Sequence, residues 1–370
     1  MKILMINSGA YPIPSNTGTE NHVYYLSNAL YKLGHEINIV SDIDTSVKFN
    51  GINVTPINFP ESHIFNIKLP GYMFRHFVGG LLAFKNARGR FDYYDIVHVH
   101  GRLAPFLTTI FKNTSPVIFT VHDDPPVKLQ PNYLLNKISY KLLQENAAKK
   151  ADFVIATSDN IIKYLGEKVS SDKITKIENG VDTEIFKLNN GIQSDNSCIF
   201  VGSLTKRKGV QYLLKAIQNI NIKCNIVGEG QEKNTLLKLS YDLGLSDKVK
   251  FLGNVPYDDL VRCYQKSSIF VLPSFNETTC ISMLEAMACG KPVIVTKVGD
   301  IPNIIKDGYN GFLVEIGNAN QVEEKLRLLI DNPDLRKEMG RNARLTVMKR
   351  YTWDIIAKKV IDVYDTVLKR

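Results

Sequence analysis

The sequence lacks any apolar stretch long enough to cross a membrane. Its longest apolar run is about eight residues, 77–84, and contains two glycines, whereas a membrane-spanning helix needs about 20. The first apolar stretch, residues 2–6, is too short for a signal peptide and is typical of a buried first strand. We therefore expect a cytoplasmic protein.

Cysteine is scarce. Five occur in 370 residues, and none belongs to a C-x-x-C pair. A disulfide framework or a cysteine-based zinc site is therefore not expected, and the thiols are expected to be reduced and to pack in the core or on helices. These residues are Cys198, Cys224, Cys263, Cys280 and Cys289.

Motifs of several protein classes are also missing. The sequence has no G-x-G-x-x-G fingerprint, no Walker loop and no G-x-S-x-G elbow. Dinucleotide-dependent oxidoreductases, phosphate-loop hydrolases and serine hydrolases therefore have no motif support. The net charge of +9 favours an acidic partner such as a nucleotide or an anionic membrane. Because no RNA-binding or DNA-binding motif is visible, we expect no nucleic-acid partner.

What the sequence does contain is a regular alternation of short apolar runs and amphipathic stretches. Val23, Leu26, Leu30 and Leu33, for example, recur at the spacing of one helical face. Alternation of this kind is typical of parallel α/β sheets with helices on both faces. Strands are predicted over 2–6, 37–40, 96–100, 117–121 and 153–157, and again over 198–201, 223–227, 249–252, 269–272 and 292–295.

The pattern starts twice, which indicates two Rossmann-like domains. A strand, a loop, a helix and a strand open the chain, and the same order recurs from Cys198. We expect a first domain over 1–187, a polar linker over 188–196, a second domain over 197–352 and a last helix over 353–370. Ligands of such sheets bind beyond the carboxyl ends of the strands, so two facing domains would hold the site in the cleft between them.

Two carboxylates follow one of the second-half strands. Glu277 lies in a loop just before a helix predicted from about residue 279 to 288, and Glu285 lies inside that helix. Such a pair can accept hydrogen bonds from two ends of a polyhydroxylated ligand, while the free N–H groups of the first helical turn meet a phosphate. Alternatively, Glu277 is a helix-capping acid and Glu285 a surface acid.

This segment resembles the Glu-x7-Glu motif of retaining glycosyltransferases, in particular glycosyltransferase family 4, which has the GT-B fold. The resemblance covers nearly the whole chain. It implies two facing Rossmann-like domains, with the last helix packing back on the first, acceptor-binding domain. Further matching segments are 17–18, 33–36, 179–182, 201–204, 208–209, 299–303 and 307–314.

The implied reaction transfers a sugar from a UDP- or GDP-linked donor to a hydroxyl of a glycan or lipid-linked acceptor. The anomeric configuration would be retained, and neither a metal nor another cofactor would be needed. The sequence alone leaves the donor base, the sugar, the acceptor and the oligomeric state open.

The resemblance also implies roles for single residues. Glu277 would bind hydroxyls of the transferred sugar, Glu285 the ribose, and Lys208 the diphosphate leaving group. His122 would approach the donor sugar near the reacting carbon, and Gly18 would let the backbone come close to the phosphates. The other donor-binding positions implied are Gly202, Arg207, Asn254, Val255, Thr278, Thr279, Cys280 and Ile281.

Some positions depart from the family pattern. Ser203 stands where many members have an arginine, a role that Arg207 or Lys206 would have to take over. The glycine-rich stretch after the first glutamate is here Thr278-Thr279-Cys280. These departures concern donor identity and rate more than the class of reaction.

Other features allow alternatives. Residues 68–90 mix basic and apolar side chains at helical spacing, which fits either a helix lying on an anionic membrane or an ordinary helix packed on the sheet. Asp42 and Asp44 match a D-x-D metal pattern in a different context, and no metal site is expected there. His98 is expected in the core, whereas His100, at a strand end, either reaches the cleft or is buried.

Three other functions remain open at this point. A nucleotide-sugar 2-epimerase shares the architecture and would form product without an acceptor. A sugar phosphorylase would use inorganic phosphate and needs a cofactor-binding lysine that is not evident. A non-catalytic basic binding protein would tolerate loss of Glu277 and Lys208.

Overall fold

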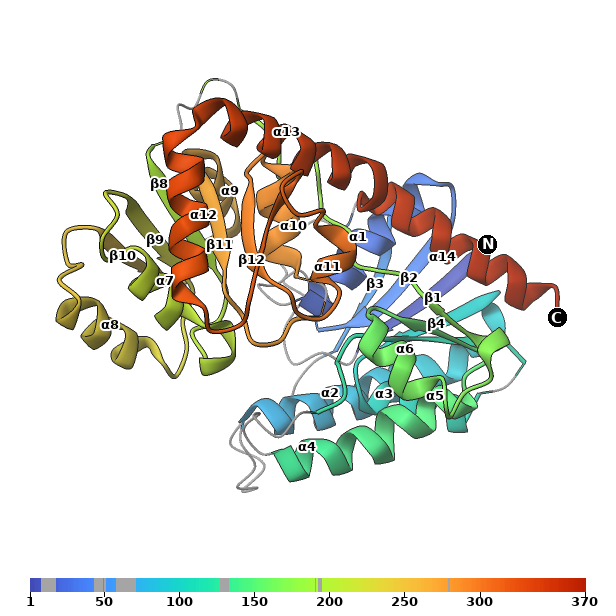
Figure 1. Cartoon of the computed structure of the whole chain (residues 1–370). Helices are drawn as coiled ribbons and strands as arrows, with labels where there is room; N and C mark the ends of the chain where they lie inside the picture. Colours follow the sequence, from blue (N-terminus) through green and yellow to red (C-terminus); the bar gives the residue numbers. More distant parts are fainter. Residues whose placement is uncertain are drawn as a thin grey trace. The chain divides into compact units, whose positions relative to one another are not determined.

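The computed structural model describes residues 1–7, 18–42, 49, 51–57, 71–112, 114–126, 133–189, 191, 195–278 and 280–370. The chain divides into two compact units (Figure 1). Unit 1 comprises Met1–Asn179 and Trp353–Arg370, and unit 2 comprises Gly180–Thr352. The thiols of the five cysteines are free, and four of them are buried, as expected. No helix in the described ranges is long and apolar enough to span a membrane.

Unit 1 is built on a parallel sheet with the order β3-β2-β1-β4-β5-β6-β7. The chain builds outward from β1 in one direction as far as β3 and then returns to the other side of β1 with β4, so the strand order reverses between β1 and β4. The strands are β1 (Lys2–Asn7), β2 (Glu36–Ser41), β3 (Asn53–Pro56), β4 (Ile96–His100), β5 (Val117–Val121), β6 (Phe153–Ala156) and β7 (Ile174–Lys176).

Helices cover both faces of this sheet because alternate strand residues point to opposite sides. Ile3 and Met5 of β1 pack with α1 and α14, whereas Leu4 and Ile6 face the core beneath α2, α3, α5 and α6. Figure 1 shows α14 and α2 on opposite sides of the sheet. The helices are α1 (Gly18–Lys32), α2 (Gly71–Ala87), α3 (Leu103–Ile110), α4 (Tyr133–Ser139), α5 (Asn146–Lys150), α6 (Asp159–Leu165) and α14 (Trp353–Leu368).

The predicted helical face of α1 is largely correct. Val23, Leu26 and Leu30 are fully buried against α14. Leu33 is exposed, contrary to the prediction, because α1 ends at Lys32 and the chain turns at Gly34, whose φ is +88°.

Unit 2 repeats the design with a parallel sheet of order β10-β9-β8-β11-β12-β13, which reverses between β8 and β11. Its strands are β8 (Ser197–Val201), β9 (Lys223–Val227), β10 (Val249–Gly253), β11 (Ile269–Leu272), β12 (Val293–Thr296) and β13 (Gly311–Val314). Its helices are α7 (Val210–Ala216), α8 (Lys233–Asp242), α9 (Tyr257–Lys266), α10 (Ile281–Ala288), α11 (Ile301–Ile304), α12 (Ala319–Asp331) and α13 (Pro333–Arg350).

The division between the units falls at Asn179, whereas the sequence suggested 187. Residues 180–187 belong to unit 2, since Val181 pairs with Thr352 and Phe186 is fully buried in the core of that unit. The polar stretch 188–196 follows this buried segment. A boundary placed by composition therefore falls several residues after the division between the units. Helix α10 begins at Ile281 and not near 279, and β3, β7 and β13 were not predicted as strands.

Candidate active site in unit 2

The predicted donor-binding residues of unit 2 lie in the segments that follow its strands at one edge of the sheet. Strands β8 and β11 are neighbours at the point where the strand order reverses. The segment with Lys208 follows β8, and the segment with Glu277 follows β11. Because both strands are parallel, both segments leave the carboxyl edge, which is where open α/β sheets bind ligands.

Lys208 and Glu277 form an ion pair within this edge. The Lys208 ammonium donates to both carboxylate oxygens of Glu277, with Nζ–Oε1 and Nζ–Oε2 distances of 2.7 and 3.0 Å. Their side chains are only 11% and 5% exposed. A cation and an anion held together at the rim of a sheet can act on one ligand that carries both phosphates and hydroxyls.

Arg207 fixes the carboxylate-bearing loop from the other side. Its guanidinium donates to the carbonyl oxygen of Asn276 at 2.6 Å, and Nη1 lies 3.8 Å from Oε2 of Glu277. The Phe275 amide in turn donates to the Arg207 carbonyl oxygen at 2.7 Å. Arg207 is therefore tied to the loop that carries Glu277.

Glycine residues allow neighbouring loops of the site to approach one another closely. A Cβ on Gly209 would lie 1.9 Å from the carbonyl oxygen of Pro273, and Gly209 has a φ of +68°. A Cβ on Gly299, whose φ is +51°, would lie 1.8 Å from the carbonyl oxygen of Glu277. A side chain at either position would displace the loop that carries Glu277.

Glu285 is held separately, inside α10. Its side chain is buried, and its Oε2 accepts a hydrogen bond of 2.8 Å from the phenol of Tyr264 on α9. Burial raises the pKa of this carboxyl to about 7, against the smaller lowering effect of the Tyr264 hydrogen bond. Glu285 is thus not the surface acid that one interpretation of the sequence allowed.

The other predicted positions of unit 2 surround the same edge. Cys280 precedes the first turn of α10, and burial, with the negative charge of Glu277 next, raises the pKa of its thiol to about 11. Gly202 follows β8, and a Cβ there would lie 3.6 Å from Cε of Lys208. Thr278 is partly buried, and Ile281 is the first residue of α10, whereas Thr279 lies outside the described residues.

Asn254 and Val255 directly follow β10, at the carboxyl edge as well. Asn254 is exposed and Val255 is half-buried. The Gly228 amide donates to the Gly253 carbonyl oxygen at 2.8 Å, which ties the end of β10 to the segment after β9. No hydrogen bond or ion pair in the described residues joins Asn254 to Glu277.

In unit 1, His122 directly follows β5 and contacts other histidines. His100, the last residue of β4, has its Nδ1 3.1 Å from Nε2 of His122. His22, from α1, packs edge-on against the His122 ring at a centroid distance of 4.6 Å. His98 is a core residue, as predicted, and hydrogen bonds to Tyr364 and Thr120.

His100 is buried within unit 1. Gly18 is the first residue of α1. Asp44 of the D-x-D pattern and residues 8–17 lie outside the described residues.

Two contacts escaped sequence reasoning. Tyr264, the partner of Glu285, and His22, the neighbour of His122, are far from these residues in the chain. No local pattern marks them. Each lies on a helix that packs against its own sheet, and this packing is not visible in the sequence.

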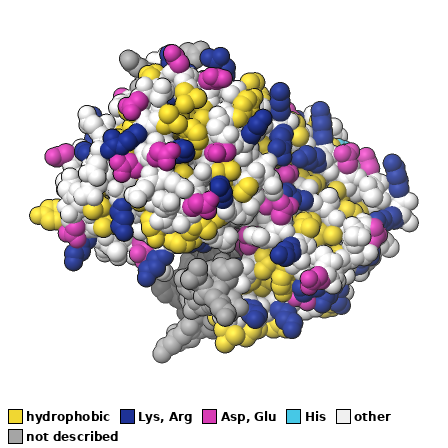
Figure 2. All heavy atoms as spheres, viewed as in Figure 1, with side chains coloured by type: hydrophobic (Ala, Val, Ile, Leu, Met, Phe, Trp, Pro, Cys, Tyr) yellow, Lys and Arg dark blue, Asp and Glu magenta, His cyan; other side chains and the backbone are white. Residues whose placement is uncertain are grey.

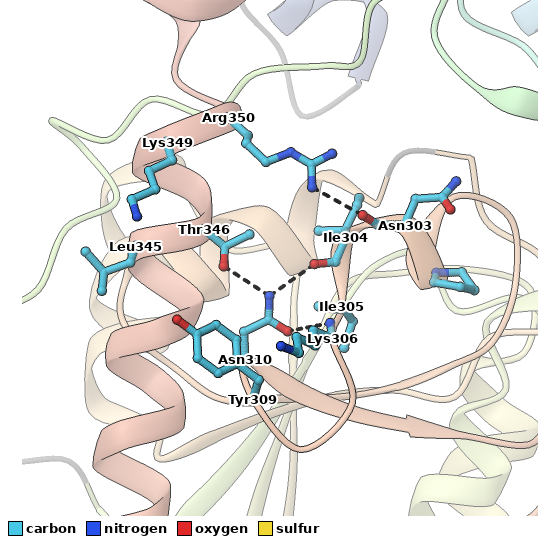
Figure 3. A pocket seen from close by; sticks show the side chains of 11 residues that line it. Asn303, Ile304, Ile305, Lys306, Tyr309, Asn310, Leu345, Thr346, Lys349 and Arg350 are labelled. Carbon is cyan, nitrogen blue, oxygen red and sulfur yellow. Dashed lines mark hydrogen bonds between the residues drawn. The ribbon is translucent and has the colours of Figure 1, made fainter.

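A surface pocket of unit 2 lies elsewhere, between α11, the turn before β13 and α13 (Figure 3). At its centre, the Asn310 amide donates to Ile304 O and to Thr346 Oγ1, and its oxygen accepts from the Lys306 amide. Asn310 immediately precedes β13, at the amino edge of the sheet. The pocket contains neither Glu277 nor Glu285 and is not the candidate active site.

Comparison with known proteins identifies the family. The model of Glycosyltransferase Family 4 matches residues 16–185, and that of Glycosyl transferases group 1 matches residues 182–346. An uncharacterised glycosyltransferase of Methanocaldococcus jannaschii is 30% identical, over 98% of each chain. The chain belongs to glycosyltransferase family 4.

Solved structures share the fold of this family-4 chain. Sucrose-phosphate synthase from Thermosynechococcus elongatus superposes with a TM-score of 0.83 at 21% identity, covering 100% of this chain and 99% of the synthase. Anabaena HepE in complex with UDP superposes with a TM-score of 0.76 at 19% identity, and the match covers 99% of this chain and 100% of HepE. The GT-B fold and the glycosyltransferase class expected from the sequence are confirmed.

Proposed function

We propose that this glycosyltransferase moves a sugar from a nucleotide-diphosphate sugar, UDP- or GDP-linked, to an acceptor hydroxyl with retention at the anomeric carbon. The observation that carries the proposal is the Lys208–Glu277 pair at the reversal point of the unit 2 sheet. One group complements phosphate and the other complements sugar hydroxyls. A nucleotide sugar presents both within one molecule.

Each residue has a part in donor binding. Lys208 and Arg207 contact the diphosphate, and the N-terminus of α10 adds its partial positive charge. Glu277 accepts hydrogen bonds from the sugar hydroxyls, and Glu285 from the ribose. Asn254 and Val255 meet the base, while Gly18 and His122 of unit 1 approach the phosphates and the sugar. The UDP bound in HepE, a protein of the same fold, supports a nucleotide donor.

The reaction exchanges one bond at the anomeric carbon for another. The bond to the diphosphate oxygen breaks, and the acceptor oxygen bonds to the same carbon on the same face. The acceptor proton passes to the departing phosphate oxygen, so the products are a glycoside and a nucleoside diphosphate. Lys208 stabilises the charge that develops on that oxygen, and the proposed transfer needs no metal and no cofactor.

We propose a glycan or lipid-linked acceptor, with unit 1 in peripheral contact with an anionic membrane. Among the described residues of α2, Ala83 and Phe84 face the core, but Phe77 and Leu81 are exposed. Leu134 of α4 and Leu142 of the π-helical segment Tyr140–Glu145 that follows it are also exposed, by 68% and 56%. Figure 2 shows apolar and basic side chains together on this lower part of unit 1. The cytoplasmic side of a membrane fits this surface.

The test is an assay of nucleoside diphosphate release from UDP- and GDP-sugars, with and without glycan or lipid acceptors and with EDTA present. The proposal predicts acceptor-dependent release that EDTA does not abolish, and proton NMR of the product showing the donor's anomeric configuration. Acceptor-independent conversion of the sugar would instead identify a 2-epimerase. Full activity of folded Glu277→Ala and Lys208→Ala variants would refute the site.

A further inference from the structure

Three histidines of unit 1 converge from three elements of the fold. His22 comes from α1, His100 ends β4, and His122 follows β5. One ring nitrogen from each lies within 4.8 Å of the others. The proposed transferase reaction uses only His122, so the convergence of the other two requires its own explanation.

His22 is held in the tautomer that a metal ligand needs. Its Nδ1 lies 2.7 Å from Oδ1 of Asn179, and because an amide oxygen only accepts, Nδ1 carries the proton and donates. Its Nε2 therefore bears a free lone pair. This nitrogen is buried and has no hydrogen-bond partner among the described residues. An outer hydrogen bond of this kind orients most metal-binding histidines.

The spacing of the other two nitrogens also suits a metal. His100 Nδ1 and His122 Nε2 are 3.1 Å apart. Two ligands at 2.0–2.1 Å from a tetrahedral zinc ion lie about 3.3 Å from each other. Without a metal the same two rings share one hydrogen bond, so metal binding requires the donor ring to carry its proton on its other nitrogen.

We propose that His22, His100 and His122 form a binding site for one divalent transition-metal ion, for which Zn²⁺ is the best match. Three imidazoles suit zinc, whereas Mg²⁺ and Ca²⁺ prefer oxygen ligands. His98 is not a fourth ligand, because Tyr364 and Thr120 engage both of its ring nitrogens. A water or a ligand oxygen completes the coordination.

The site has a consequence for catalysis, and this part rests on the proposed function. A zinc ion would engage His122, the residue that the proposed function assigns to the donor sugar. Zinc should therefore inhibit a transfer reaction that itself needs no metal. Chelation by EDTA should restore the rate.

The test is a zinc titration of the tag-free full-length protein at pH 7.5, with a chromophoric chelator as competitor. The wild type should bind about one Zn²⁺ per chain, and His22→Ala and His100→Ala should each weaken binding by roughly 100-fold or more. His35→Ala is the matched control, because His35 lies outside the cluster, and it should bind like the wild type. Equal binding by all variants, or no wild-type binding in the micromolar range, would overturn the proposal.

Cobalt gives a second measurement that needs no variant. Co²⁺ bound to the wild type by three imidazoles should show the intense visible absorption of a four-coordinate site, and Zn²⁺ should displace it. A weak, six-coordinate spectrum would contradict the site. Zinc binding by Lys208→Ala should be unchanged, since Lys208 belongs to unit 2, so the metal site can fail or hold independently of the donor site.

Discussion

Lys208 Nζ lies 2.7 and 3.0 Å from the two carboxylate oxygens of Glu277, across 69 residues of sequence. The pair exists because β8 and β11 are adjacent and parallel, so that the segments after them leave the same edge. Both side chains are nearly buried. Such a pair holds a cation and an anion next to each other at the edge of the sheet.

Removing one partner of this pair should affect both stability and activity. Among the described residues, Lys208→Met leaves the buried Glu277 with Arg207 as its remaining cation, 3.8 Å away, so we expect a loss of about 3 kcal/mol in the free energy of unfolding. Transfer should fall by about 100-fold or more, because the charge on the leaving group loses its main counter-charge. Denaturant unfolding and nucleoside diphosphate release measure the two effects.

The double variant Lys208→Met/Glu277→Gln separates these effects. It removes both charges together, so its stability should return most of the way to that of the wild type. Its transfer activity should remain as low as that of the single variants. A double variant that recovers activity along with stability would show that the pair serves folding alone.

The Glu285 carboxyl predicts a pH dependence. Burial raises its pKa in the folded protein to about 7 from a usual value of 4.5. Below pH 4.5 the folded and unfolded states are both protonated. Between 4.5 and 7 only the unfolded state ionises, so the wild type loses about 3 kcal/mol of stability as pH rises through this window.

Glu285→Gln is the variant that isolates this effect. The amide does not titrate, and its oxygen can still accept from Tyr264. The free energy of unfolding of the variant, relative to the wild type, should therefore rise between pH 4.5 and 8. Its nucleotide affinity should be lower than that of the wild type. Calorimetric unfolding at several pH values gives the difference in the free energy of unfolding between the variant and the wild type. The contributions of the other titrating groups are the same in both proteins and cancel. A constant difference across the range would mean that Glu285 is ionised in the folded protein at pH 5.

Glycine substitutions test the contact between the two site loops. In Gly209→Ala the new Cβ would meet the carbonyl oxygen of Pro273, and we expect weaker donor binding as well as lower stability. Gly244→Ala is the matched control, since Gly244 has nearly the same φ, +69° against +68°, but open space around it. The control should lose only about 1–2 kcal/mol, from its left-handed backbone, and should bind donor normally. Equal donor affinities for the two variants would argue against the loop contact as a determinant of the site.

The exposed apolar residues of unit 1 predict membrane binding. Leu134→Glu and Leu142→Glu should each weaken sedimentation with anionic vesicles by roughly tenfold, because each removes apolar area and adds repulsion. Tyr241→Glu, at an equally exposed apolar site in unit 2, should have no such effect. If neutral and anionic vesicles bind the wild type equally, the basic residues of this surface have no part in it.

Much of the fold was predictable because strands that are buried on both faces appear in the sequence as short apolar runs. The bounds of β4, β5, β9 and β11 agree with the sequence prediction. Strand β3 escaped it, since this edge strand, 53–56, is polar and only partly buried. The unit boundary was misplaced because Phe186 joins the second core before the polar stretch begins.

The site was predictable only in part. Glu277 and Lys208 stand in motifs, but their pairing depends on strand order, which a motif does not contain. Burial raises the pKa of Glu285 against the opposing effect of the Tyr264 hydrogen bond, and neither the burial nor this partner is visible in the local sequence. No local pattern marks His22 either, because its approach to His122 follows from the packing of α1 on the sheet.

Nucleotide binding by the wild type and by Lys208→Met is the most direct test of the central claim. Thermal unfolding is followed with UDP, GDP and ADP and their sugars, without metal. A ligand at 100 times its Kd stabilises the folded protein by about 2.7 kcal/mol. The account predicts a clear shift with one nucleotide in the wild type and a much smaller one in Lys208→Met. No shift with any nucleotide in the folded wild type would contradict it.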